Sequence, residues 1–258
     1  MKKLYILIST YGQRINELHN VLLPRNEDIK YLVSHQAWKN VDVDKSLFER
    51  DDVYYFPNDS VGVTKSRNFL IEKAQVADYI YFCDDDIKLN PDIYELIVLA
   101  HKKTDSAIVT FNVSKDENVD FNFQTDFKLR NRNRTNILSV GTVQISAKRD
   151  LIKNVRFCEY MGAGSEIPIG DEAIFLSDIM TNYTISHADV NICYHPHESS
   201  GSCKESKFSY ARGMTIRKVF GFYYGSLIVI PFFIFRAKLF RYSPKQFIDY
   251  IKGFLKVK

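Results

Sequence analysis

Three consecutive aspartates, Asp84, Asp85 and Asp86, end an apolar run of the sequence. Carboxylates this close repel one another, and they ionise together only when a cation or hydrogen-bond donors compensate them. Such hard oxygen ligands favour Mg²⁺ or Mn²⁺, which fill their other positions with water and substrate phosphates. The triplet therefore predicts a divalent metal site and a phosphorylated substrate. The alternative is a solvated turn before a helix that starts near residue 91, with one aspartate as its cap.

A second acidic site follows a glycine-rich stretch over residues 162–170, where Asp171 and Glu172 open a predicted helix. Acidic residues are favoured at a helix N-terminus by the helix dipole, so a purely structural role as first-turn caps stays open. Glycines, however, let the backbone approach a ligand closely, and a carboxylate at the rim of an acidic cleft suits a general base. The pair is therefore a candidate for proton transfer.

Two histidines, His195 and His197, follow a short apolar run at residues 192–194 and are separated by one proline. Imidazole binds divalent transition metals and also titrates near neutral pH. Either histidine is a candidate to complete the metal shell begun by the aspartates. The structural role of a hydrogen-bonded histidine remains the alternative for each.

Apolar runs alternating with helical patterns must position these groups. We expect strands at residues 3–8, 31–33, 52–56 and 79–82, and helices at 63–74 and 91–102. Continuous apolar strands followed by helices are typical of a doubly wound, parallel α/β sheet, whose ligands bind beyond the carboxyl ends of the strands. Thr10, His35 and the aspartate triplet all fall on that edge.

The pattern changes after residue 102. Runs at residues 107–111, 121–123 and 137–145 predict mixed or antiparallel strands, and the basic stretch 128–134 between them is expected to be a mobile loop. Residues 1–200 read as one catalytic domain. Four widely spaced cysteines and the absence of a leader-like segment after Met1 predict reduced thiols and a cytoplasmic location.

Residues 201–258 form a distinct basic arm. They contain twelve lysines and arginines and two carboxylates, a net charge of +10, whereas the whole chain carries +4 and residues 1–200 therefore −6. Residues 222–235 are strongly apolar and aromatic, which favours an anionic membrane surface over nucleic acid as the partner. With Gly225 and Pro231 inside, the segment fits an interfacial or re-entrant element better than a transmembrane helix. A helix packed on the body is the alternative.

The ordered set of residues 9–11, 65–68, the aspartate triplet, residues 170–172 and the late histidines resembles family 2 glycosyltransferases of the GT-A fold. The similarity is greatest to bacterial enzymes that build capsule, O-antigen or other surface polysaccharides. It extends over residues 3–200, and the order and spacing of the short motifs carry it.

The resemblance implies a role for each matching residue. Donor-binding residues would come from the first strand and its loop, from the following helix and from the triplet: Thr10, Tyr11, Arg14, Lys65, Arg67, Asn68, Asp84 and Asp85. Asp86 would bind Mn²⁺ or Mg²⁺ with Asp84 and with His195 or His197. Glu172 aligns with the family's base, but the acidic pair is reversed here, so Asp171 is the alternative. The residues after strand two, 34–36, lack the family's aspartates.

The implied activity is metal-dependent, inverting transfer of a sugar from a nucleotide-diphosphate sugar to a hydroxyl of a saccharide acceptor. A lipid-linked acceptor and a peripheral position on the inner face of the cell membrane follow from the basic, aromatic arm. Two other classes remain as alternatives. One is a nucleotidyltransferase acting on a sugar phosphate, although Ser9 to Arg14 contain only one glycine for a triphosphate loop. The other is a non-catalytic membrane-surface scaffold with the same fold.

Overall fold

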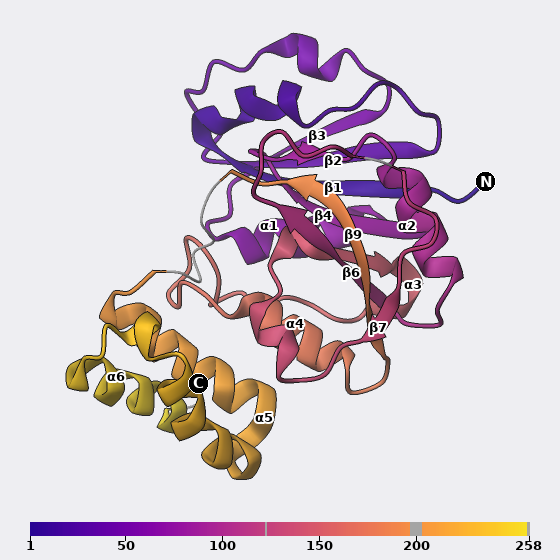
Figure 1. The fold of residues 1–258 in the computed structure, drawn as a ribbon. Coiled ribbons are helices and arrows are strands. Elements are labelled where there is room, and N and C mark those ends of the chain that lie inside the picture. Colours follow the sequence, from indigo (N-terminus) through magenta and orange to yellow (C-terminus); the bar gives the residue numbers. More distant parts are fainter. Residues whose placement is uncertain (122, 197–202, 257–258) are drawn as a thin grey trace.

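The computed structural model describes residues 1–121, 123–196 and 203–256, which form a mixed sheet flanked by helices and a helical C-terminal segment (Figure 1). Its strands lie in the order β3-β2-β1-β4-β8-β6-β9-β5, with β7 also paired to β9. Their bounds are β1 Leu4–Tyr11, β2 Ile29–Gln36, β3 Val53–Asn58, β4 Tyr79–Asp84, β5 Lys88–Leu89, β6 Ile108–Ser114, β7 Leu129–Asn131, β8 Ile145–Lys148 and β9 Ile185–Tyr194.

The first four strands confirm the predicted parallel half of the sheet. β1 pairs with β2 and β4, and β2 pairs with β3, all in parallel. Because the strands run the same way, their carboxyl ends meet at one edge, where Ser9 of β1 lies opposite Asp84 of β4. The helix predicted between β3 and β4 is α1, Val63–Lys73, and the helix after the triplet is α2, Ile93–Lys102.

The second half of the sheet is mixed, as expected, but its strands differ from the prediction. Residues 137–145 were expected to form one strand, which is wrong: η3 (Asn136–Ser139) and η4 (Thr142–Gln144) are 3-10 turns, and β8 begins only at Ile145. The backbone N–H of Gly141 donates to Gln144 Oε1 over 2.8 Å, which stabilises the turn. These turns still bury Ile137 and Val143. The apolar residues of this segment therefore indicate that it is buried, although it does not form a strand.

Two further local expectations are corrected. The stretch 128–134, expected to be a mobile loop, contains β7, which pairs antiparallel with β9. Arg132 Nη2 lies 2.9 Å from His187 Nδ1 and helps to fix this segment on the sheet. Neither Phe121 nor Phe123 lies in a strand, and neither is buried, so no sheet face covers them; Asn122 lies outside the described residues.

Two apolar cores cover the two faces of the sheet. One core joins strand residues to η1 (Gly12–Asn20) and α2, through side chains such as Leu18 and Leu96. The other joins the opposite strand residues to α1, to α4 (Asp171–Ile179) and to the start of α5, through side chains such as Leu70, Phe175 and Met214. The sheet edge that bears the aspartates is thus held between two layers of helix, with α3 (Arg149–Ile152) following β8.

The C-terminal segment contains α5 (Ser206–Phe235) and α6 (Pro244–Leu255), joined through η6 (Ala237–Phe240). The two helices touch backbone to backbone at glycines. A Cβ at Gly213 would lie 1.9 Å from the Tyr250 carbonyl oxygen, and one at Gly253 would lie 1.9 Å from that of Tyr210. The first half of α5 also contributes Ala211 and Met214 to the core beneath α4, so it is a packed helix.

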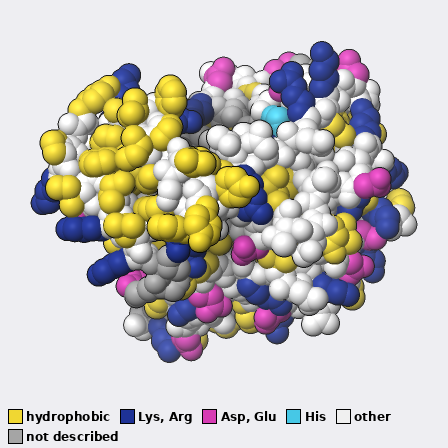
Figure 2. Space-filling model, turned by 90° about the horizontal axis from the view of Figure 1, so that it is seen from below, with side chains coloured by type: hydrophobic (Ala, Val, Ile, Leu, Met, Phe, Trp, Pro, Cys, Tyr) yellow, Lys and Arg dark blue, Asp and Glu magenta, His cyan; other side chains and the backbone are white. Residues whose placement is uncertain are grey.

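The second half of α5 is different, because it exposes apolar side chains. The helix is long and apolar enough to cross a membrane, with a mean hydropathy of 1.7, and only 17% of its most apolar window is buried. Figure 2 shows apolar side chains gathered over this part of the molecule. The large exposed ones on α5 are Phe222, Tyr223, Tyr224, Leu227, Ile230, Ile234 and Phe235. The expected interfacial segment is therefore a helix with an exposed apolar surface.

Candidate active site

The predicted metal-binding groups converge at the carboxyl end of β4. Asp84 ends this strand, Asp86 lies in the turn after it, and His195 follows β9, which reaches the same place from the other half of the sheet. One ligand atom from each of these three side chains lies within 4.8 Å of the other two. The His195 Nε2 to Asp86 Oδ1 distance is 3.6 Å. Residues more than a hundred positions apart thus form one cluster.

The chemistry of this cluster fits a divalent cation. Asp86 Oδ1 is buried and accepts no hydrogen bond from the described residues. A buried acceptor without a donor is costly, and a cation satisfies it. Two carboxylates and one imidazole suit Mn²⁺, and the carboxylates with water suit Mg²⁺. His197, the second histidine predicted for the metal, lies outside the described residues.

The middle aspartate of the triplet serves a different purpose. Asp85 is buried, accepts a 2.6 Å hydrogen bond from Thr10 Oγ1, and is paired with Arg14. Arg14 Nη2 also lies 2.9 Å from Asp86 Oδ2. Burial raises the pKa of Asp85 to about 6, although the Thr10 hydroxyl and the Arg14 guanidinium oppose the shift. Two predicted donor-binding residues, Thr10 and Arg14, are therefore partners of the triplet itself.

One buried guanidinium connects the triplet to the second acidic pair. Arg67 points from α1, and its Nη1 lies 2.8 Å from Asp171 Oδ2 and 3.6 Å from Glu172 Oε1. Its Nη2 lies 3.7 Å from Asp84 Oδ1. Burial alone would lower the pKa of Arg67, but the surrounding carboxylates raise it, so this side chain stays charged. The two acidic sites predicted separately thus belong to one site.

The two members of the acidic pair have different surroundings. Asp171 is buried, whereas the Glu172 side chain is 23% exposed and accepts a 2.5 Å hydrogen bond from Thr142 Oγ1. Burial and the neighbouring Glu172 raise the pKa of Asp171, while the charged Arg67 guanidinium opposes this shift. Gly170 begins α4 with φ 99°, and a Cβ there would lie 2.0 Å from Thr215 Oγ1, so only glycine permits this approach.

The remaining predicted donor-binding residues lie around this centre in different ways. Tyr11 is exposed at the end of β1. Lys65 lies on the exposed face of α1 and lines a separate pocket with Glu159 and Ser165. Asn68 is buried, and its amide both donates to and accepts from the backbone of Phe157, at 2.9 and 2.8 Å. The structure therefore brings Tyr11 to the rim of the edge, but it does not bring Lys65 into the aspartate cluster.

The residues after β2 are engaged within the protein. His35 is buried between the Gly12 carbonyl and the Tyr55 hydroxyl, each 2.9 Å from a ring nitrogen. Gln36 donates to the carbonyls of Ser60 and Gly62. Thr142, by contrast, was not singled out from the sequence, because its pairing with Glu172 depends on the turn η4 and on a contact between distant segments.

Comparison with known proteins agrees with this geometry. Residues 41–155 match the family model described as glycosyl transferase family 2, a segment that includes Arg67 and the aspartate triplet. No curated protein sequence matches the chain.

Several solved structures are similar in fold. S. aureus TarS, residues 1–349, is 16% identical with a TM-score of 0.65, covering 98% of this chain and 80% of that one. The structure of the same protein in complex with UDP-GlcNAc is 16% identical with a TM-score of 0.63, covering 97% of this chain and 79% of that one. A third similar structure is the mannosyltransferase PcManGT from Pyrobaculum calidifontis in complex with GDP-Man and Mn²⁺. It is 13% identical with a TM-score of 0.55, covering 97% of this chain and 73% of that one.

The fold and the partial sequence match both point to one class of proteins to which this chain is similar. Residues 41–155 match the family 2 glycosyltransferase model, and the chain shares its fold with solved structures that include a mannosyltransferase. The resemblance read from the sequence is confirmed at this level.

Proposed function

We propose that the chain transfers a sugar from a nucleotide-diphosphate sugar to a hydroxyl of a saccharide acceptor, with a divalent metal and with inversion at the anomeric carbon. The observation that carries this proposal is the single cluster formed by the two acidic sites. Asp84, Asp86 and His195 lie at the edge of the sheet, and Arg67 joins Asp84 to Asp171 and Glu172. A donor phosphate and an acceptor hydroxyl would thus find complementary groups within one cluster of side chains.

The donor side of the site would use the triplet. Asp84, Asp86 and His195 hold Mn²⁺ or Mg²⁺, which when bound neutralises charge on the departing nucleoside diphosphate. Tyr11, exposed beside the triplet, provides an aromatic surface for the nucleoside, and Thr10 orients Asp85. Arg14 supplies a positive charge near the diphosphate, since it lies at the Asp86 carboxylate. The similar structures in complex with UDP-GlcNAc and GDP-Man support a nucleotide-sugar donor.

The acceptor side would use the acidic pair. We assign Glu172 as the base that takes the acceptor hydroxyl's proton, because its side chain is partly exposed and Thr142 orients it. Asp171 is buried against Arg67, so its role is to hold that guanidinium in place. One base and one attack on the anomeric carbon give a single displacement, which inverts the configuration.

The acceptor is proposed to be lipid-linked and the reaction to belong to surface polysaccharide synthesis, such as that of capsule. The net charge of +10 over residues 201–258 attracts an anionic membrane, and the exposed aromatic side chains of α5 enter its boundary. This combination favours a peripheral position on the cytoplasmic face of the cell membrane, where a lipid-linked acceptor is presented.

A panel of nucleotide sugars tests the proposal. The protein is incubated with each donor in the presence of Mn²⁺, Mg²⁺ or a chelator, and the released nucleoside diphosphate is measured. We expect one donor to be hydrolysed slowly in a metal-dependent way. When a saccharide acceptor is added, NMR of the new glycosidic bond should show inverted configuration. Turnover that persists in the chelator contradicts the metal assignment. Release of pyrophosphate from a nucleoside triphosphate and a sugar phosphate, with no sugar transfer, identifies a nucleotidyltransferase instead.

A further inference from the structure

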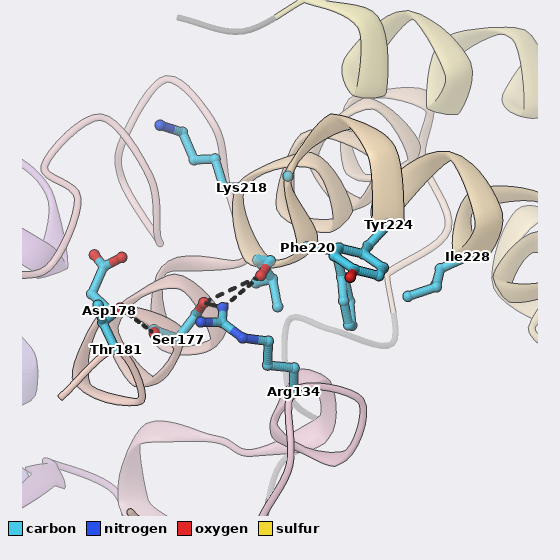
Figure 3. Close-up of a pocket in the computed structure, with 10 residues that line it drawn as sticks. Arg134, Ser177, Asp178, Thr181, Lys218, Phe220, Tyr224 and Ile228 are labelled. Atoms are coloured by element: carbon cyan, nitrogen blue, oxygen red, sulfur yellow. Dashed lines mark hydrogen bonds between the residues drawn. The ribbon is translucent and has the colours of Figure 1, made fainter. Parts of the chain in front are cut away.

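A second pocket lies away from the aspartates, where α4, α5 and the loop before η3 meet. It has a volume of about 660 Å³. Its lining includes two cations, one carboxylate and three large side chains of α5, namely Arg134, Lys218, Asp178, Phe220, Tyr224 and Ile228. In Figure 3, Asp178 and Lys218 lie to one side of the Arg134 guanidinium, and Phe220, Tyr224 and Ile228 lie to the other. One side of the pocket is therefore charged and the other is apolar.

Arg134 is held firmly at the centre of this pocket. Its Nη1 donates to Ser177 Oγ and, over 2.7 Å, to the Val219 carbonyl. Ser177 Oγ also donates to the same carbonyl over 3.4 Å, and Figure 3 marks these contacts. Among the described residues, every hydrogen bond of Arg134 runs through Nη1. A guanidinium has five N–H donors, so the Nη2 and Nε donors of an already oriented group remain for a ligand.

The pocket exists because α5 is interrupted at its edge. Gly221 has φ 72° and ψ −174°, a conformation that essentially only glycine adopts. The interruption turns the apolar half of α5 away from the helix that precedes it and places the Val219 carbonyl where Arg134 binds it. A Cβ at Gly221 would meet nothing within 4 Å, so its conformation, and no packing contact, requires glycine there.

The charges and the apolar surface of the pocket together indicate an amphiphile. Arg134 and Lys218 outweigh Asp178 by one positive charge, and Arg is well suited to bidentate phosphate binding. Tyr224 and Ile228 are one helical turn apart on the half of α5 that exposes its apolar surface, so the apolar wall continues outward from the pocket. We propose that this pocket binds the phosphate of a membrane lipid, with the lipid chain lying along Tyr224 and Ile228.

This inference extends the proposed function. Its link to a lipid-linked acceptor rests on that proposed function. Ser177 and Asp171 belong to the same helix, α4, and their separation of six positions corresponds to about 9 Å along its axis. A lipid phosphate held at Arg134 would therefore lie less than two turns along α4 from the acidic pair. Lipid binding is measured without a sugar donor and without turnover. The lipid proposal can therefore be contradicted while the transferase proposal stands, and the transferase proposal can be contradicted while lipid binding is confirmed.

Calorimetric titration of the full chain with short-chain phosphatidic acid, below its micelle concentration, tests the proposal. Arg134→Gln should weaken binding roughly ten-fold or more, because it removes a charge-assisted contact to the phosphate. Lys245→Gln is the matched control: it removes the same charge from an exposed position of α6 outside the pocket, and it should leave affinity unchanged. Asp178→Asn should strengthen binding, since it removes the only carboxylate in the lining.

The outcomes separate the possible ligands. Equal losses in Arg134→Gln and Lys245→Gln mean diffuse attraction to the basic segment and overturn the proposal. Inorganic phosphate that binds as tightly as phosphatidic acid means a free-phosphate site and overturns the lipid assignment. If short-chain phosphatidylcholine, whose phosphate carries a choline group, binds as tightly as phosphatidic acid, the pocket does not recognise the exposed phosphate and the proposal is wrong. Arg134→Gln also removes the hydrogen bonds to Ser177 and Val219 and could damage the pocket. Asp178→Asn controls for this, because a damaged pocket would not gain affinity for phosphatidic acid.

Discussion

Arg67 Nη1 lies 2.8 Å from Asp171 Oδ2, although the two residues are 104 positions apart in the chain. Both side chains are buried, and the contact joins α1 to the first turn of α4. It also fixes the spacing between the metal-binding edge and the acidic pair, because the same guanidinium lies 3.7 Å from Asp84. The shape of the candidate active site therefore depends on this ion pair.

Arg67→Gln should destabilise the protein by about 3–5 kcal/mol, because it leaves the Asp171 carboxylate buried without a positive partner. Chemical denaturation measures this change. The double variant Arg67→Gln with Asp171→Asn should recover part of the loss, since neither buried charge remains. Lys39→Gln, which breaks the exposed pair with Asp59, is the control and should cost no more than about 1 kcal/mol. An unchanged denaturation midpoint in Arg67→Gln would sink this account of the site.

Asp86→Ala should abolish sugar transfer and metal-dependent nucleotide binding while the fold remains. Stability should hold or rise, because the variant relieves repulsion within the triplet and removes a buried oxygen that lacks a donor. Mn²⁺ binding followed by electron paramagnetic resonance is read alongside thermal unfolding. Glu117→Ala, an exposed carboxylate outside the site, is the control. Retention of most activity, or loss of metal binding only through unfolding, contradicts the metal assignment.

Glu172→Gln should lower turnover by roughly 10²-fold or more while the affinity for donor changes little, since proton transfer is specific to the transition state. Asp171→Asn should act differently, because it weakens the hold on Arg67 and should lower stability as well as turnover. Steady-state kinetics and unfolding of the two variants are compared. If both transfer sugar at the wild-type rate, the pair is only a cap on α4.

Stability should fall as the pH is lowered from about 6.5 towards 3, in part because of His101. Burial lowers the pKa of this residue to about 3, its Nε2 lies 2.7 Å from Ser146 Oγ, and its ring stacks on Tyr79. The unfolded chain, with a histidine pKa of about 6.5, binds a proton in this window that the folded chain excludes. The contribution is fully present above pH 6.5 and is lost as the pH falls.

His101→Gln should flatten that pH dependence, because the variant keeps a polar group near Ser146 but no longer takes up the proton. The slope attributable to one proton is at most about 1.4 kcal/mol per pH unit. Urea unfolding between pH 4 and 7, in buffers of about equal ionic strength, measures it. His19→Gln, at an exposed position, is the comparison. Identical slopes in wild type and His101→Gln would contradict the prediction.

Replacing the exposed apolar side chains Tyr223, Leu227 and Phe235 with serine should release the protein from anionic liposomes in flotation. Wild-type binding should be only partly reversed by high salt, because apolar burial persists when charge attraction is screened. The same number of replacements on the body, at Tyr54, Val61 and Val76, is the matched control. If wild-type protein stays in the soluble fraction at low salt, the apolar half of α5 is a contact with another protein surface.

Substitution is a cleaner test of membrane binding than truncation near residue 203. The basic segment begins, by charge, at about that point, but Ala211, Met214 and Val219 belong to the same buried core as Phe175. Removing them would expose the underside of α4 and disturb the acidic pair at its other end. A truncated chain that lost transfer would therefore not distinguish membrane binding from local unfolding.

Much of the parallel half of the fold follows from local sequence, because strands buried on both faces are continuous apolar runs, as at residues 79–82. The run at residues 137–145 is also rich in apolar residues, but it is buried through 3-10 turns that the Gln144 side chain stabilises, and periodicity does not reveal such turns. The ligand types of the site were also readable, since three adjacent aspartates are chemically conspicuous. The pairing of Arg67 with Asp171 could not be predicted from the sequence, because it forms only when distant segments pack together.

The interruption at Gly221 divides α5 into two parts that pack differently. The backbone there has left helical geometry, and a Cβ at this position would meet nothing within 4 Å. A residue inserted or removed at this point should redirect the apolar half of α5 and break its contacts with α6, such as that of Gly225 with Phe254, while Ala211 and Met214 stay in the core. The direction of the apolar half of α5 is therefore set by its contacts with α6, separately from the core beneath α4.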